Sequence, residues 1–407
     1  MWEILIKSFV LAGGLMTAAA YLVLLERKMA AWVQDRCGPN RVGIPLTNIR
    51  LFGLGQPIAD GLKFILKEEF TPAHVDRRLF VAAPIIMLTS ALSVFAVIPF
   101  GDVIPPLKLW GWGWDRPIPL AIAPHMDTAL LFVFALNSIA VYGVILGGWA
   151  SNNKYSLLGG LRSSAQLIAY ELALSLGILG VVLASGSLNI RRIVEMQAET
   201  GVWFVLAQPI GFVVFVTAAF AEAARLPFDL PECEQELVGG YHTEYSGMKL
   251  LLFLIAEFLH MVTAAMLIVL LFLGGWHFWG ITSWADSNSW LGAILRVVVF
   301  AVKTVGVILF FMLVRWSWPR FRFDQLMALA WKVMLPLGLL SVAVVAVVEQ
   351  SKLSGLESWL GRVPAAWLMV IPAWVVAALA WWVVAVAGPS ISDNTPRREP
   401  AGWDVQF

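Results

Sequence analysis

Runs of about 20 apolar residues recur along this chain, and they constrain its fold more than any other feature of the sequence. A bilayer core about 30 Å thick is crossed by a helix of roughly 20 such residues. Nine stretches reach this length, at approximately 2–25, 79–100, 127–149, 164–185, 202–224, 248–273, 293–314, 327–348 and 363–387. Charged residues make up 14% of the chain, against roughly 25% in soluble domains. The sequence therefore predicts an all-α, polytopic membrane protein with about nine transmembrane helices.

The distribution of Lys and Arg predicts how the chain is oriented in the membrane. If the N-terminus lies outside, the inner segments are 26–78, 150–163, 225–247, 315–326 and the tail from 388. These segments carry 17 Lys and Arg residues, and the opposite loops carry 7. Because short loops rich in Lys and Arg stay on the cytoplasmic side, this bias predicts an N-out, C-in topology. Charged residues directly after the first apolar run favour a retained helix over a cleaved signal peptide.

Several functions are excluded for the chain by itself. Its two cysteines, Cys37 and Cys233, are too few and too far apart to hold an iron–sulfur cluster or a zinc ion. The sequence contains no GxxxxGK, GxGxxG or HExxH motif, so no nucleotide site or zinc protease site is predicted. A net charge of +1 without a basic run gives no indication of nucleic-acid binding. Redox chemistry must therefore come from partner proteins, and we expect no metal or bound cofactor on this chain.

Two cytoplasmic segments are more than connectors. From Pro57 to Glu69 the pattern predicts an amphipathic helix at the membrane surface, with Asp60, Lys63 and Lys67 on one face. The second segment, Arg225 to Gly247, contains five acidic residues and one basic residue. Apolar residues interleave with these acids, so a solvated acidic loop and a folded functional segment are comparable alternatives.

Ionisable side chains also occur inside the apolar runs, where each costs roughly 2.5 kcal/mol or more. They include Lys7, Glu171, Glu222, Glu257, His260, Lys303 and Lys332, of which Lys7 lies near the outer end of its run. Glu257 and His260 lie one helical turn apart, but two ligands are too few for a metal site. A carboxyl group removed from water can take up and release a proton near neutral pH. Glutamates on three spans therefore favour a proton pathway over the alternative, in which they are packing groups or are paired with the lysines.

Three motifs are long enough to be specific. The first combines ERK at 26–28 with DRCGPNRVG at 35–43 and QPIADGLK at 56–63. The second runs from AEAARLPFDLPE at 221–232 to GYHTEYSG at 240–247, and the third contains RW at 315–316, PR at 319–320, Arg322 and DQLM at 324–327. Together they resemble the respiratory complex I subunit 1 family, whose bacterial members are the H subunits of NADH-quinone oxidoreductase. The resemblance divides the chain into a family-like transmembrane domain at 1–348 and an extension at 349–407 with an extra transmembrane helix and a polar tail.

The resemblance implies a membrane-arm subunit that helps to form a quinone-binding chamber and couples quinone reduction to proton translocation. The residues that it places at the quinone are Arg27, Arg36, Asp60, Lys63, Arg225, Phe228 and Asp229. The residues that it places in a proton relay are Glu171, Glu222, Glu232, Glu234, Glu236 and Glu257. Such a chain is active only as part of a multi-subunit NADH:quinone oxidoreductase.

The same resemblance implies the partners and the location. Iron–sulfur clusters, FMN and NADH would belong to partner subunits, while quinone is the substrate. The partners would be iron–sulfur and quinone-site subunits of the hydrophilic arm, small membrane-arm subunits, antiporter-like subunits and lipid, in a bacterial inner membrane. One alternative is the related membrane subunit of an energy-converting hydrogenase or ferredoxin-linked complex. Another is a stand-alone ion-coupled transporter, which is disfavoured because the sequence has no visible internal repeat.

Overall fold

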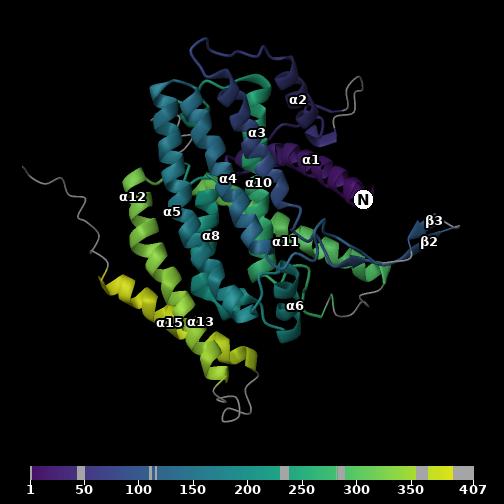
Figure 1. The fold of residues 1–407 in the computed structure, drawn as a ribbon, viewed down its shortest axis with the longest axis vertical. Helices are drawn as coiled ribbons and strands as arrows, with labels where there is room; N and C mark the ends of the chain where they lie inside the picture. Colours follow the sequence, from purple (N-terminus) through teal and green to yellow (C-terminus); the bar gives the residue numbers. More distant parts are fainter. Residues whose placement is uncertain are drawn as a thin grey trace, which may run out of the picture.

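Helices make up almost all of the regular structure in the computed structural model of this chain (Figure 1). The structure describes residues 2–43, 51–109, 112–114, 117–229, 238–280, 282, 289–353 and 365–387. The long helices are α1 (Trp2–Val33), α3 (Arg77–Val94), α4 (Ala129–Ala150), α5 (Lys154–Ser185), α10 (Gly247–Phe272), α11 (Trp290–Ser317), α13 (Leu335–Leu353) and α15 (Ala365–Ala387). The shorter ones are α2 (Gln56–Leu66), α6 (Ile190–Thr200), α7 (Phe204–Ala207), α8 (Pro209–Glu222) and α12 (Phe323–Ala328), with 3₁₀ turns η1 (Leu51–Gly53) and η2 (Gly240–His242) and a π-helical turn η3 (Leu329–Met334).

A central bundle is formed by α3, α4, α5, α8 and α10, which pack against one another side by side (Figure 1). Helices α1 and α11 extend from the α10 side of this bundle, and α13 and α15 cover the side formed by α5 and α8. Helix α10 is the most enclosed of the long apolar helices. Of the residues in its 18-residue apolar stretch, 83% are buried. Its residues therefore meet side chains from both halves of the chain.

Polar residues fix where several helices begin. Asp76 accepts hydrogen bonds from the backbone N–H groups of Arg78 and Leu79, and Asn153 accepts one from Tyr155. The Ser289 side chain accepts a hydrogen bond from the backbone N–H of Gly292 at the start of α11. These side chains satisfy N–H groups that the first turn of a helix leaves without partners.

The fifth apolar run is not one continuous helix. Helix α7 ends at Ala207, Gln208 takes φ −138° and ψ 64°, and α8 begins at Pro209. Proline has no backbone N–H and clashes with the carbonyl four residues before it, so the helix breaks at this point. The Gln208 side chain is buried and donates to the Gly180 carbonyl of α5 at 3.1 Å, which ties the break to the bundle.

The all-α, polytopic class predicted from the sequence is confirmed. Seven helices of the described chain are long and apolar enough to cross a membrane, and two shorter apolar helices cover Pro209–Glu222 and Val370–Val383. All nine predicted stretches thus correspond to apolar helices or helix pairs. The count of nine spans and the N-out topology stay predictions.

The remaining elements lie in the connections. Two short antiparallel pairs, β1 (Val103–Ile104) with β4 (Ile118–Pro119) and β2 (Leu107–Leu109) with β3 (Trp112–Trp114), follow α3 and precede α4 along the chain. Strands β2 and β3 project to one side of the molecule (Figure 1). Helix α2 matches the predicted amphipathic helix, with Pro57 in its first turn. One face of α2 exposes Ile58, Leu62, Ile65 and Leu66, as a helix at a membrane surface requires.

Candidate functional site

The larger of two cavities that share a wall lies between α1, α2 and α10 and has a volume of about 360 Å³. One part of its wall is apolar and includes Val23, Phe64, Leu254 and Phe258. Its charged lining residues are Glu26, Arg27, Asp60, Arg225, Glu257 and Arg315. The cavity therefore combines an apolar wall with a concentrated set of ionic groups.

Arg225 is the centre of a buried ionic cluster in this cavity. Its Nη1 donates to both carboxylate oxygens of Glu26 at 3.1 Å, and its Nε lies 3.0 Å from Glu257 Oε1. Arg315 also donates to Glu26, and the Arg225 guanidinium lies 4.4 Å from the centre of the Phe258 ring. Two carboxylates and two guanidinium groups thus balance one another at a site where an isolated charge would be costly.

At the edge of this cavity Arg27 and Asp60 form an ion pair of 2.7 Å that joins α1 to α2. Gln56 also donates to Asp60 at 3.2 Å. Local sequence explains the pairing only in part. The Pro57 start of α2 sets the turn in which Asp60 faces the cavity, but the approach of α1 is a tertiary contact.

The structure brings together only some of the predicted quinone residues. Arg27, Asp60 and Arg225 line the larger cavity. Arg36 and Lys63 are exposed, and neither is among the residues that line it.

Phe228 and Asp229 lie elsewhere in the fold. Phe228 is buried between Tyr170 and Phe321, with ring centroids 5.5 Å from each. Asp229 accepts a hydrogen bond of 2.9 Å from Arg320. Burial raises the pKa of Asp229 to about 6, because the opposing effect of Arg320 is smaller. These two residues hold the start of the acidic segment against the third motif.

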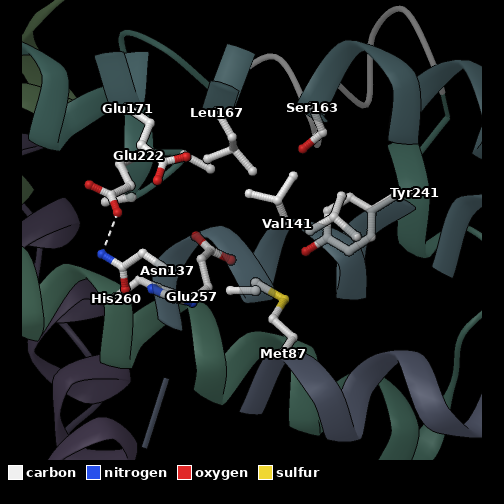
Figure 2. A pocket seen from close by; sticks show the side chains of 14 residues that line it. Met87, Asn137, Val141, Ser163, Leu167, Glu171, Glu222, Tyr241, Glu257 and His260 are labelled. Carbon is white, nitrogen blue, oxygen red and sulfur yellow. Dashed lines mark hydrogen bonds between the residues drawn. The ribbon is translucent and has the colours of Figure 1, made fainter. Parts of the chain in front are cut away.

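The smaller cavity has a volume of about 40 Å³ and lies inside the helix bundle (Figure 2). It brings together Glu171 of α5, Glu222 from the end of α8, and Glu257 and His260 of α10. Glu222 accepts a hydrogen bond of 2.6 Å from Asn137, and Glu171 accepts one from Ser138. A volume of this size has room for about three water molecules, at roughly 10–15 Å³ each.

Glu257 lines both cavities, so the two share this side chain as part of a common wall. On one side it contacts Arg225, and on the other it faces the cavity with Glu171 and Glu222. The three intramembrane glutamates predicted as a relay thus line one small cavity. Glu232, Glu234 and Glu236 lie outside the described residues.

The sequence did not predict a role at this site for four polar residues that line the two cavities. Glu26 and Arg315 stand inside motifs that the sequence singled out, but nothing local distinguished them from their charged neighbours. Asn137 was not predicted as a site residue, because a single amide side chain in an apolar run often has only a packing role. His260 was noted as an ionisable group inside an apolar run and as half of an incomplete metal pair, but it was not assigned to the relay.

Among the described residues, neither Lys303 nor Lys332 forms an ion pair with Glu171, Glu222 or Glu257. Lys303 donates to three backbone carbonyls that directly follow α10, those of Leu273, Gly275 and His277, at 2.6–3.1 Å. A cation is favourable there because the carbonyls at a helix C-terminus carry partial negative charge. Lys332 is exposed. In the part of the chain that the structure describes, no cluster of three or more potential ligands could hold a metal ion.

Comparison with known proteins gives one consistent result. The chain matches the sequence model of the family described as NADH dehydrogenase over residues 6–346. It is similar to an H subunit of NADH-quinone oxidoreductase from Geobacter metallireducens, with 47% identity over 329 residues, 81% of this chain and 91% of that protein. It is also similar to NADH-quinone oxidoreductase subunit 8 of Thermus thermophilus, with 46% identity over 347 residues, 85% of this chain and 87% of that protein. The H subunit from Flavobacterium psychrophilum is 43% identical over 334 residues, which cover 82% and 92% of the two chains.

Proposed function

The chain belongs to the NADH dehydrogenase family, and from this membership we propose that it acts as the H subunit of a proton-pumping NADH:quinone oxidoreductase (complex I). In this role it forms part of the quinone chamber and couples quinone reduction to proton translocation. It works only as one subunit of the assembled enzyme. The single observation that carries the coupling role is the position of Glu257 in the wall between the two cavities.

The larger cavity suits a quinone because of its mixed lining. A quinone has a polar headgroup with two carbonyl oxygens and an apolar isoprenoid tail, and ligand sites of this kind are mostly apolar with a few placed polar groups. Arg27 and Arg225 supply charged N–H donors, while the residues of α10 and the Phe64 side of α2 supply the apolar wall. Arg36, Lys63, Phe228 and Asp229 stay proposed quinone-site residues on the resemblance alone.

Reduction of the quinone takes two electrons and two protons, so charge appears in the chamber during each turnover. Arg225 contacts both Glu26 and Glu257, and a change in its ionic surroundings alters which of these carboxylates is best stabilised. Glu257 then transmits the change to the cavity that holds Glu171 and Glu222. We place Glu232, Glu234 and Glu236 at the chamber end of this relay, as the family resemblance implies.

In this proposed role, the redox chemistry belongs to partner subunits. Electrons reach the chamber from an iron–sulfur cluster, and FMN and NADH bind further away, on subunits of the hydrophilic arm. Small membrane-arm subunits and antiporter-like subunits receive the proton signal. The assembly resides in a bacterial inner membrane, as the apolar helices and the bacterial relatives support. The hydrogenase alternative is not favoured, because the relatives are named as quinone oxidoreductase subunits.

The test compares two electron acceptors in the purified complex. The variant Arg27→Gln removes one charged donor of the chamber, while Asp60 keeps its hydrogen bond from Gln56. We expect the KM for a short-chain quinone to rise by about tenfold, the effect of losing a charged hydrogen bond of about 1.5 kcal/mol. NADH oxidation with ferricyanide, which bypasses the chamber, is expected to stay at the level of the unmodified complex.

The matched control is Arg192→Gln, on the exposed face of α6 and away from both cavities. An unchanged quinone KM in the Arg27 variant would remove Arg27 from the chamber. A complex that purifies without NADH:quinone activity but evolves hydrogen would replace the whole proposal with the hydrogenase alternative.

A further inference from the structure

The smaller cavity contains a titratable side chain that the proposed relay does not use, His260 of α10. In the described part of the chain its Nε2 atom is buried and has no hydrogen-bond partner. Asn137 of α4 lines the same cavity, and among the described residues its buried Oδ1 atom also has no hydrogen-bond partner. The other polar atom of that amide, Asn137 Nδ2, donates to Glu222 at 2.6 Å. Figure 2 shows Asn137 and His260 on the same side of the cavity as Glu222, with Tyr241 on the other.

Two buried polar atoms without partners in one cavity point to a bridging molecule. A buried polar atom of this kind is costly when it is left unpaired, because it has given up its hydrogen bonds to water. Buried water molecules typically make about three hydrogen bonds to groups of this kind, and each needs roughly 10–15 Å³. The volume of about 40 Å³ admits such a water between His260 and Asn137. The water can donate to Asn137 Oδ1 and exchange a proton with the imidazole.

We propose that His260 is a further proton-carrying residue of this cavity, and that it links Glu257 to Glu222 through a water held by Asn137. The inference rests on the proposed role of the cavity as a proton route. Residues three apart on a helix are neighbours, so the imidazole lies next to the Glu257 side chain. Imidazole suits the task because it ionises near neutral pH in water and carries two nitrogens, one to receive a proton and one to release it.

The proposed transfer balances without any other reactant. A proton that arrives on Glu257 from the chamber side passes to the neutral imidazole, which leaves an imidazolium and restores the Glu257 carboxylate paired with Arg225. The imidazolium returns a proton to the water, the water passes one of its own to the Glu222 carboxylate, and the imidazole is neutral again. The other titratable groups that line the cavity beside His260 are Glu257 on its own helix, Glu171 on α5, Glu222 on α8 and Tyr241 of η2.

The experiment uses the assembled complex in proteoliposomes. The variants His260→Asn and His260→Gln keep a side chain that binds water but cannot ionise. We expect the rate of NADH-driven proton pumping to fall by roughly a hundredfold or more, as for the loss of a positioned proton carrier. NADH oxidation with ferricyanide is expected to stay unchanged. The control His125→Asn, at an exposed position in the loop before α4, is expected to pump normally.

A parallel variant, Glu222→Gln, separates this inference from the proposed function. Full pumping in both His260 variants together with weak pumping in Glu222→Gln would overturn the role of His260 and leave the proton route intact. Full pumping in all three would overturn the route as well.

A second measurement needs no substitution. In the unmodified complex with isotope-labelled histidine rings, the infrared difference spectrum of quinone reduction is expected to contain a label-sensitive imidazole band. The absence of any such band would overturn the inference even if the His260 variants failed to assemble.

Discussion

At the scale of single residues, the site depends on charges that balance where water is scarce. Glu26, Arg225 and Glu257 are each at least 90% buried, and Arg315 completes the cluster. Removing one partner from a buried ion pair typically costs 3–5 kcal/mol, because the other charge is left without compensation. The cluster is therefore sensitive to any negative charge that forms in the larger cavity, and this sensitivity is what a coupling site requires.

Asp229 provides a pH-dependent prediction at the same scale. Burial raises its pKa from 3.8 to about 6. Between these values the folded protein keeps a proton that the unfolded chain has lost, so the free energy of unfolding falls as pH rises through this window. From pH 5 to pH 7 the loss amounts to about 1 kcal/mol.

The measurement is the thermal unfolding midpoint of the purified complex at pH 5 and pH 7. We expect the midpoint of the unmodified complex to fall more between these pH values than that of Asp229→Asn, which cannot titrate. The control Asp127→Asn, at an exposed position, should behave like the unmodified complex. Equal falls in the unmodified complex and in Asp229→Asn would contradict the shifted pKa.

At the scale of elements, the smaller cavity depends on close backbone contacts between helices. Helix α5 carries Glu171 and also meets η2, which supplies Tyr241 to the same cavity. A Cβ atom at Gly159 of α5 would lie 2.7–2.8 Å from backbone atoms of Gly240 and Tyr241. The adjacent Gly160 has more room, with its nearest neighbour at 3.5 Å. The absence of a side chain at Gly159 therefore sets how closely η2 approaches α5.

This difference predicts opposite outcomes for two adjacent substitutions. We expect Gly159→Ala to lower the stability of the complex by about 1–3 kcal/mol, the usual effect of forcing extra atoms into a packed interior. Gly160→Ala should be tolerated. The check is the thermal unfolding midpoint together with the yield of assembled complex, and equal values for both variants would show that η2 can move away from α5 at little cost.

At the scale of the whole molecule, the C-terminal helix α15 packs on α7, α8 and α13 without lining either cavity. Its Trp374 donates to the Leu206 carbonyl at 2.9 Å, close to the break between α7 and α8. A carbonyl freed by a helix break is costly inside a bilayer, and a neighbouring helix can satisfy it. Helix α15 thus supplies a hydrogen-bond donor next to the broken fifth helix, and a stabilising role for the extension, like the division of the chain at residue 348, remains our proposal.

Truncation of the chain tests this structural role. A chain that ends at Leu353 lacks α15, and a control that ends at Ala387 lacks only the residues after it. We expect both to keep NADH:quinone activity per assembled complex. The shorter chain should have the lower thermal unfolding midpoint, and loss of quinone activity in a fully assembled complex would show that α15 acts on the site itself.

The sequence by itself determined the properties that depend on neighbouring residues. Twenty apolar residues in a row predict a spanning helix whatever its surroundings, since a bilayer leaves no other way to satisfy the backbone. In the same way the Pro57 start and the apolar face of α2 were readable, and the three motifs identified the family.

Only the tertiary structure decided which of the candidate residues meet. Glu26 and Arg225 are 199 residues apart, and their ion pair exists because α1 and the segment after α8 both pack against α10. Helical periodicity gives the face of a residue but not the helix that this face contacts. For that reason the sequence did not reveal that Lys303 binds carbonyls, that Arg36 and Lys63 lie away from the larger cavity, or that Glu257 belongs to both cavities.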